Sequence, residues 1–205
     1  MKQHKSNLGT LFVALIILLI LAACAKPYHF YVKYNLVESA VDLKGQKVFL
    51  TVLDERDSVD FLSQKARNEF DLWDGRYVLY HTPQKPKGNI ETYPLIGLIE
   101  AAIKMRLETM GITVETEKRD DIPLFEVTLN KFFLVLKDRT WVSDFSYEVK
   151  LALDNQKTAR EKVFGQAERT KVMGRGAGEI LVGEIFTESL NKLDIEKLFK
   201  NAVIE

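Results

Sequence analysis

The chain is poor in the residues that build metal centres and disulfide frameworks. Its 205 residues include a single cysteine, Cys24, and three histidines, His4, His29 and His81. One thiol excludes an intramolecular disulfide, and no two histidines stand at a spacing typical of metal ligands. We therefore expect no zinc or haem site and no cofactor.

An excess of charge of either sign is also lacking, as are low-complexity segments. Twenty-nine basic and 29 acidic residues give a formal net charge of zero. No global field would therefore attract nucleic acid. We find no Gly/Ser or Gln/Asn tract and no internal repeat. These absences indicate one folded domain that binds no nucleic acid.

Motifs that carry catalysis are missing as well. The chain has no nucleophile elbow, and the segment Gly174-x-Gly-x-Gly lacks both the Lys-Ser/Thr ending of a P-loop and the spacing of a dinucleotide site. It indicates a flexible joint between a strand and a helix, with an anion or lipid-headgroup contact as the alternative. The run Asp54 to Asp57 is typical of a solvated strand end holding one ion pair, with a carboxylate site as the alternative. We expect no catalytic residue, and we predict that the protein is not an enzyme.

The longest apolar run lies at the N-terminus. Lys2 and Lys5 precede it, and it ends in Leu21-Ala22-Ala23-Cys24. A basic start, a short apolar segment and a small-residue cleavage site are the parts of a signal peptide. The run is near the lower limit for a membrane-spanning helix, which needs about 20 residues. An uncleaved anchor and a buried helix therefore stay open as alternatives.

The closing tetrapeptide resembles the lipobox of bacterial lipoproteins. This resemblance implies that a diacylglycerol is attached to the sulfur of Cys24 and that cleavage removes residues 1–23. Two or three acyl chains, such as palmitate, would then hold the protein firmly on a membrane, whereas one chain binds only marginally. Ala25, in place of Asp after the cysteine, resembles an outer-membrane address. We expect a lipid-anchored outer-membrane protein that faces the periplasm.

The residues after the cysteine begin with a β-like pattern. Residues 24–46 are expected to hold the lipid anchor and a tether, with a possible strand that starts near Tyr28. Lys47 to Asp54 is β-rich and predicts a strand. Residues 58–92 are the least regular part of the sequence. We expect a mobile excursion from the core here, that is, a long irregular segment, with one short helix near Gln64 to Phe70.

Helical and alternating periods divide the rest of the chain. Apolar spacings of three and four predict a helix from Tyr93 to Met110, with Gly111 in the left-handed position after it. Three alternating segments between residues 124 and 171 predict an antiparallel meander. A phase slip at Lys131 indicates a bulge, and charges on the third segment mark an edge strand. Helical spacing then returns, with Asp194 as the N-cap of a last helix.

This order of segments predicts the fold class. We expect an α+β two-layer domain over residues 47–205, with a mainly antiparallel β-sheet packed against two or three helices. The densest apolar cluster is Phe132 to Leu136 together with Trp141. Such a cluster is typical of a core, and any exposed part would be a surface for a partner or an acyl chain.

The binding residues are not identified by any motif. Loops collect binding residues, so the aromatic side chains of the irregular segment form a second candidate surface. The candidates that we carry forward are Trp73, Tyr77, Tyr80 and Trp141.

Several segments in this order resemble one known family. The lipobox is followed by VFLTVLDERD, LIGLIEAAIKMRLETMGITVE, PLFEVTLNKFF and GEILVGEIFTESLNKL. Together they resemble the YajG-like family of bacterial lipoproteins, which offers no catalytic residues and implies only Cys24 as a modified site. We expect an accessory or scaffold protein with an envelope protein partner and a membrane anchor. The alternatives are a lipid- or amphiphile-binding auxiliary of a transport system, with its ligand between sheet and helices, and an envelope hydrolase.

Overall fold

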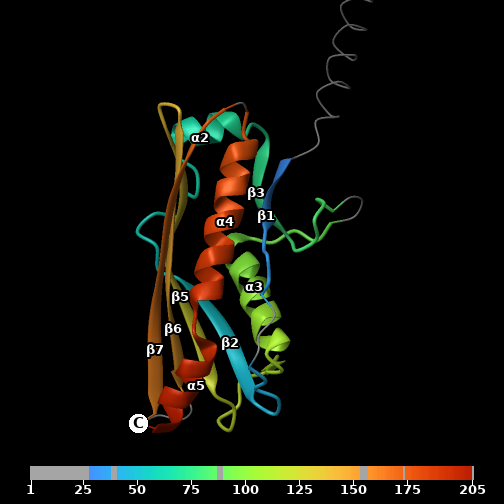
Figure 1. The fold of residues 1–205 in the computed structure, drawn as a ribbon, viewed down its shortest axis with the longest axis vertical. Helices are drawn as coiled ribbons and strands as arrows, with labels where there is room; N and C mark the ends of the chain where they lie inside the picture. Colours follow the sequence, from blue (N-terminus) through green and yellow to red (C-terminus); the bar gives the residue numbers. More distant parts are fainter. Residues whose placement is uncertain (1–27, 38–40, 87–89, 153–156, 173, 205) are drawn as a thin grey trace, which may run out of the picture.

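The meander expected from the alternating segments is the centre of the fold (Figure 1). The computed structural model describes residues 28–37, 41–86, 90–152, 157–172 and 174–204. The signal segment, Cys24 and the lipobox lie outside these residues, so cleavage and acylation stay predictions. The elements are β1 (Tyr28–Lys33), β2 (Lys47–Asp54), α2 (Gln64–Glu69), β3 (Trp73–Tyr80), α3 (Leu95–Thr109), β4 (Thr113–Glu115), β5 (Leu124–Lys137), β6 (Thr140–Ala152), β7 (Thr158–Thr170), α4 (Gly176–Lys192) and α5 (Ile195–Ile204).

The main sheet has five strands in the order β4-β2-β5-β6-β7. β6 runs antiparallel to both of its neighbours, β5 and β7, as the alternation predicts, and the charged strand β7 is at an edge. β2 joins β5 in parallel, because the chain crosses over through α2, β3 and α3 before it returns to the sheet. The predicted α+β class is confirmed, and the parallel addition of β2 is a feature that the alternation did not indicate.

The phase slip in β5 is a true irregularity of the sheet. The pairing of β5 with β6 shifts register between Leu129 and Lys131. After this shift, Phe132 and Leu134 face the core, with 1% and 0% of their surface exposed. Phe133 and Val135, which are partly exposed, face the other way. The bulge therefore keeps one buried face along a strand of 14 residues.

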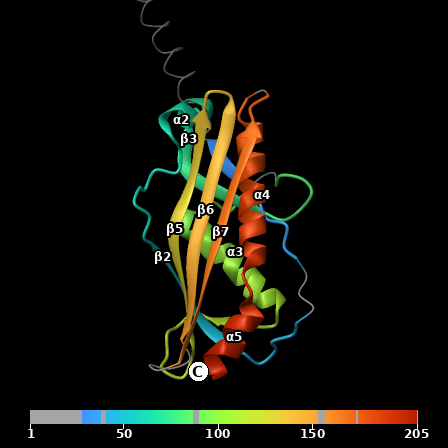
Figure 2. The same cartoon turned by 60° about the vertical axis from the view of Figure 1, so that its left-hand side comes forward.

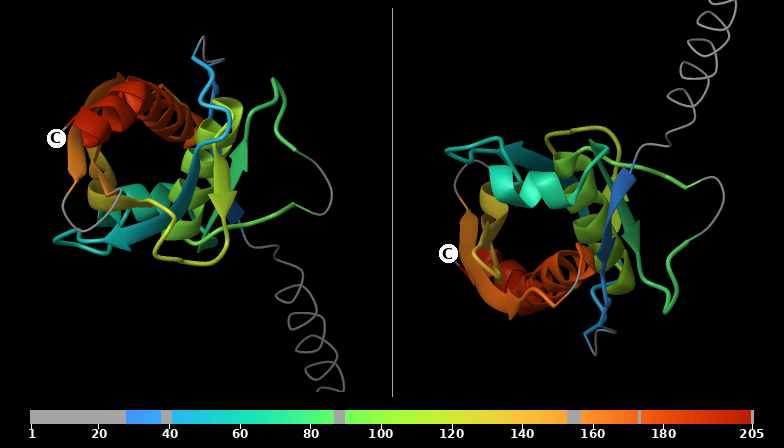
Figure 3. Two further views of the ribbon diagram at one scale, coloured as in Figure 1. Left: turned by 90° about the horizontal axis from the view of Figure 1, so that it is seen from below. Right: turned by 90° about the horizontal axis from the view of Figure 1, so that it is seen from above.

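The helices pack on the inner face of the sheet. α4 contacts β6, β7 and β1, whereas α3 contacts β2 and β3. Figure 2 shows α4 running along the meander, and the views along the long axis show the helices facing the curved sheet (Figure 3). Among the described residues, no helix combines the length and the hydrophobicity needed to cross a membrane.

Residues 58–92 are more regular than the sequence indicated. The short helix is confirmed as α2, with the Ser63 hydroxyl accepting a hydrogen bond from the Ala66 N–H at 3.3 Å. The expected excursion, however, also contains β3, which pairs in parallel with β1 and brings Phe30 beside Tyr77. This strand was missed because its first half carries Asp74-Gly75, a turn dipeptide, and because its partner lies far away in the sequence.

Glycines in α4 bring this helix close to its neighbours. A Cβ at Gly178 would lie 3.3 Å from the Trp141 ring, and one at Gly183 would lie 3.2 Å from the backbone N and O of Lys33. β1 can therefore lie directly against α4, where Phe30 and Val32 have no exposed surface. The possible strand expected after the lipobox is thus part of the core.

Candidate functional site

A cavity of about 440 Å³ opens where β1, the end of β3, α4 and the loop after β3 meet. We call it the Glu179 pocket. It is lined by Tyr31, Lys33, Asn35, Tyr80, Lys85, Gly176, Glu179, Ile180, Gly183 and Glu184. Its position follows from the close packing of β1 on α4, which places a polar helix face beside the aromatic residues of two strands.

Glu179 is the central polar group of the pocket. Its side chain is only 7% exposed and belongs to the first turn of α4. One carboxylate oxygen accepts hydrogen bonds from the Tyr28 hydroxyl and, at 3.0 Å, from the Tyr31 N–H. The other accepts from Lys85 Nζ at 2.6 Å. A buried carboxylate needs such donors to remain charged, and the helix N-terminus favours the same negative charge.

Aromatic rings surround the cationic groups near Glu179. Lys85 Nζ lies 4.5 Å from the centroid of the Tyr31 ring, and the Arg175 guanidinium lies 3.5 Å from that of Tyr28. Burial, followed by the hydrogen bond to Glu179, raises the pKa of Tyr28. Burial and the charge of Glu179 likewise raise the pKa of Tyr80. The site thus places one buried carboxylate and two ring faces against cationic side chains.

The four candidate residues from the sequence do not form one surface. Tyr80 lines the Glu179 pocket. Trp73 is half-buried and donates its indole N–H to the Arg76 carbonyl oxygen at 3.0 Å. Tyr77 is 2% exposed and Trp141 has no exposed surface, so both are core residues. The structure therefore leaves Tyr80 as the candidate that can touch a ligand in this pocket.

A second cavity, of about 470 Å³, lies beside the half of β5 that follows the bulge. We call it the β5 groove, lined by Arg56, Asp57, Ser58, Asp60, Leu62, Ser63, Gln64, Arg67, Asn130, Lys131, Phe132, Phe133 and Val135. Arg56 is 6% exposed and binds the Asp54 carboxylate with two hydrogen bonds of 2.8 Å. These bonds lower the pKa of Asp54. The run thus supplies the expected ion pair at the strand end, but the Arg56 side chain is buried rather than solvated.

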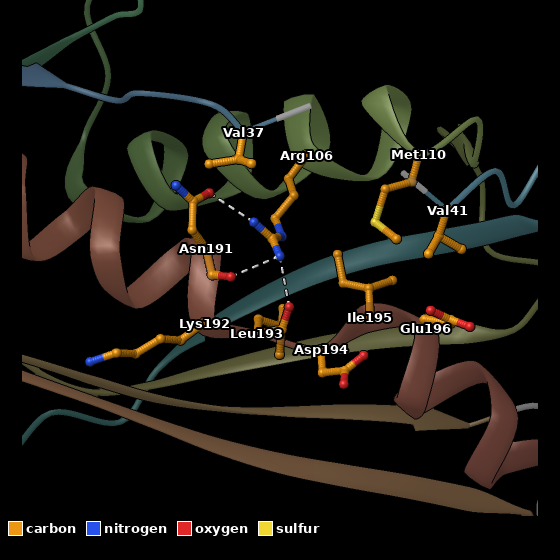
Figure 4. Close-up of a pocket in the computed structure, with 10 residues that line it drawn as sticks. All are labelled: Val37, Val41, Arg106, Met110, Asn191, Lys192, Leu193, Asp194, Ile195 and Glu196. Carbon is orange, nitrogen blue, oxygen red and sulfur yellow. Dashed lines mark hydrogen bonds between the residues drawn. The ribbon is translucent and has the colours of Figure 1, made fainter. Parts of the chain in front are cut away.

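A third cavity, of about 340 Å³, lies near the end of α4 (Figure 4). Arg106 from α3 donates to Asn191 Oδ1 at 2.8 Å and to the Leu193 carbonyl oxygen at 2.7 Å. Carbonyls at a helix C-terminus lack partners within the helix. Arg106 supplies those partners and joins α3 to the α4–α5 junction, where Asp194 Oδ1 accepts from the Lys197 N–H at 2.9 Å. The hydrogen bonds in this cavity therefore hold α3 to the junction of α4 and α5.

No metal centre is visible in the part of the chain that the structure describes, where no three His, Cys, Asp or Glu side chains gather in a way that would hold an ion.

Glu179 is the functional candidate that the sequence did not reveal. It stands in a helix of mostly apolar residues, which is a weak signal for a buried charge. Its partners Tyr28 and Lys85 are 151 and 94 positions away, so no local pattern could connect them.

The architecture is similar to that of solved structures. Protein XCC0632 from Xanthomonas campestris, described with the family model DUF330, aligns with a TM-score of 0.53 and 13% identity. The alignment covers 85% of this chain and 95% of that one. At this identity the similarity shows the fold alone.

Weaker alignments reach proteins described as lipoproteins. Rare lipoprotein B from Shewanella oneidensis gives a TM-score of 0.38 at 14% identity, over 51% of this chain and 87% of its own. Lipoprotein GNA1162 from Neisseria meningitidis gives 0.31 at 12% identity, over 72% and 96%. No protein-family model and no curated protein matches the sequence, so the YajG-like resemblance stays a prediction.

Proposed function

We propose that this protein is a lipid-anchored, non-enzymatic accessory or scaffold of an outer-membrane or periplasmic complex in the bacterial envelope. The observation that carries the proposal is the direct connection between the acylation motif and the core. Cys24 stands four positions before Tyr28, the first residue of β1. Four extended residues reach at most about 14 Å. An acylated Cys24 would therefore hold the start of β1 close to the bilayer.

The strand that follows the tether is part of the core. Phe30 and Val32 of β1 have no exposed surface, and Tyr31 is tied to Glu179 of α4 through its backbone. A short tether to a strand that is packed into the core would hold the folded domain close to the membrane. A protein held in this way can present a constant surface to a partner, which is what a scaffold needs.

The outer surface offers places for such a partner. Phe164 on β7 is 68% exposed and stands on an edge strand of 13 residues. An edge strand has backbone groups free for pairing, and charges such as Arg160 and Lys162 limit unspecific pairing. These features support an interaction role over a catalytic one.

Fractionation of cells tests the anchor. Cys24→Ala should move the protein from the membrane to the soluble fraction and abolish labelling by a palmitate analogue, because no thiol is left to acylate. Thr116→Ala, an exposed site outside the three cavities described above, is the control and should behave as the wild type. A wild-type protein that takes up no label, or a Cys24→Ala variant that stays with the membrane, would contradict the anchor.

Crosslinking in cells tests the scaffold role. The tagged, lipidated protein should capture one envelope protein near stoichiometry, identified by mass spectrometry. Recovery of lipid without any protein partner would refute the scaffold role and favour a carrier.

A second candidate function is amphiphile binding, favoured by the two-sided apolar character of β5. The ligand was expected between sheet and helices, but that layer is occupied by core side chains such as Phe132 and Leu134. Phe133 and Val135 instead line the β5 groove, beside Arg56. An amphiphile would bind there, with its acyl part on the apolar floor. Native mass spectrometry with added phospholipid tests this role, and a Val135→Asp variant that binds as much lipid as the wild type would contradict it.

A further inference from the structure

Lys85 occupies a site in which a carboxylate and an aromatic ring favour a cation. It belongs to the irregular stretch after β3, and its side chain, 49% exposed, reaches a carboxylate that is 7% exposed. Its ammonium is also held against the Tyr31 ring at 4.5 Å. A half-exposed lysine on a loop gains little from an ordinary surface pair. Here, however, the carboxylate is already fixed by Tyr28 and Tyr31, so the acceptor is pre-organised for any ammonium that reaches it.

The pocket beside this ion pair has room for more than the lysine side chain. Its volume is about 440 Å³, and its walls include the Tyr31 and Tyr80 rings together with Ile180. Aromatic faces attract an ammonium, and apolar walls accommodate the methylene stem that carries it. The site is therefore suited to bind a lysine side chain.

The way in which Lys85 enters the pocket indicates what kind of molecule could replace it. Lys85 is presented by the segment Pro83-Gln84-Lys85-Pro86, which has no regular secondary structure. The protein thus holds a short, proline-flanked peptide of its own against the pocket. This contact within the protein is an example of how an extended peptide that carries a lysine would bind the pocket.

We propose that the Glu179 pocket binds a lysine side chain on an extended segment of a partner protein, and that Lys85 occupies the pocket as an internal competitor until that segment displaces it. This inference rests on the proposed scaffold function and names the chemistry of its partner. The internal lysine reduces the apparent affinity in proportion to the fraction of time for which it fills the pocket. Removal of Lys85 should therefore strengthen binding of an external lysine.

A titration with the protein's own loop sequence tests the proposal. The probe is a synthetic peptide with the sequence of residues 81–86, which holds one lysine, and the protein is the full chain in detergent. The Lys85→Ala variant should bind this peptide at least about tenfold more tightly than the wild type, which corresponds to an internal lysine that is bound about nine-tenths of the time. Lys85→Arg keeps a cation in the pocket and should show no such gain. Lys137→Ala, at an exposed site of the β5–β6 turn, should match the wild type.

Two further arms identify the groups involved. A peptide with alanine in place of its single lysine should bind Lys85→Ala at least about tenfold more weakly than the original peptide does. The original peptide should likewise bind the Lys85→Ala/Glu179→Gln double variant at least about tenfold more weakly than it binds Lys85→Ala. Equal binding of the two peptides, or no binding of either to Lys85→Ala, would overturn the proposal. Binding of n-butylamine or ethanolamine as tightly as the peptide would also overturn it, because the site would then recognise an amine without a polypeptide.

The result is independent of the anchor and of the partner's identity. Peptide binding by Lys85→Ala together with a Cys24→Ala variant that stays on the membrane would refute only the proposed function. The reverse pattern would refute only the role of the pocket.

Discussion

Replacement of Glu179 by alanine should destabilise the fold more than any exposed carboxylate does. Glu179 accepts three hydrogen bonds, from Tyr28, Tyr31 and Lys85, and so ties β1 and a distant loop to α4. A hydrogen bond to a charged group contributes roughly 1.5–3 kcal/mol when it is shielded from water. The pair with half-exposed Lys85 adds about 1 kcal/mol, the upper end for a surface pair, because the carboxylate is already held in place by its other donors.

Partial exposure of the two tyrosines lowers this total. We assign the lower end of the range to each of their bonds, and we subtract about 0.5 kcal/mol for the better helix propensity of alanine. The expected loss is then about 3 kcal/mol. For a domain of this size, a loss of that magnitude lowers Tm by roughly 6–12 °C.

Urea unfolding is the suitable assay, on the Cys24→Ala background and followed by tryptophan fluorescence. The midpoint should fall while the slope m is unchanged, since the surface exposed on unfolding stays the same. Glu184→Ala is the matched control in the same helix. Its carboxylate also pairs with an arginine, Arg169 at 2.6 Å, but is 55% exposed, so its loss should cost no more than about 0.5 kcal/mol. A Glu179→Ala variant within about 0.5 kcal/mol of this control would refute the reasoning.

The remaining predictions concern the helix contact and the strand end. Gly183→Ala should be about 1–3 kcal/mol less stable than Gly176→Ala in urea unfolding. Both substitutions improve helix propensity, but only the methyl group at position 183 would press on the Lys33 backbone, whereas position 176 has open space around it. Equal stabilities of the two variants would contradict the close contact. Asp54→Asn should cost about 1 kcal/mol at neutral pH by breaking the pair with Arg56. The pKa of Asp54 is lowered from 3.8 by Arg56, so the charged form contributes stability above that pH and the contribution is lost as pH falls through the lowered pKa. Stability curves of variant and wild type should therefore converge in acid, and a constant difference across pH would contradict this role.

Local features of the fold could be predicted because their causes are local. Gly111, expected in the left-handed position after a helix, has a φ of +82° at the end of α3. Asp194 was expected to cap the last helix, and its carboxylate does accept the Lys197 N–H. The bulge near Lys131 followed from a change of parity that is visible in adjacent residues. Each of these depends on the conformational preference of a few neighbouring positions.

Pairings between distant segments could not be predicted in the same way. β3 finds its partner in β1, which lies about 45 positions earlier, and β2 inserts in parallel beside β5. Strand order depends on which apolar faces can be buried together, and the alternation of a single strand gives no information about its neighbour. The irregular composition of residues 58–92 also hid β3, since Gly75 takes a φ of +79° within the strand.

By itself, the sequence determined the resemblance to a lipobox, the α+β class, the meander and most helix boundaries. These follow from hydrophobic period, turn residues and capping, which act over a few residues. The tertiary structure alone decided that Tyr77 and Trp141 are core residues and that Tyr80 lines a pocket. It alone made Glu179 the centre of that pocket. The physical reason is that burial and charge pairing are properties of the packed arrangement, in which groups from β1, α4 and a loop meet only after the whole chain has folded.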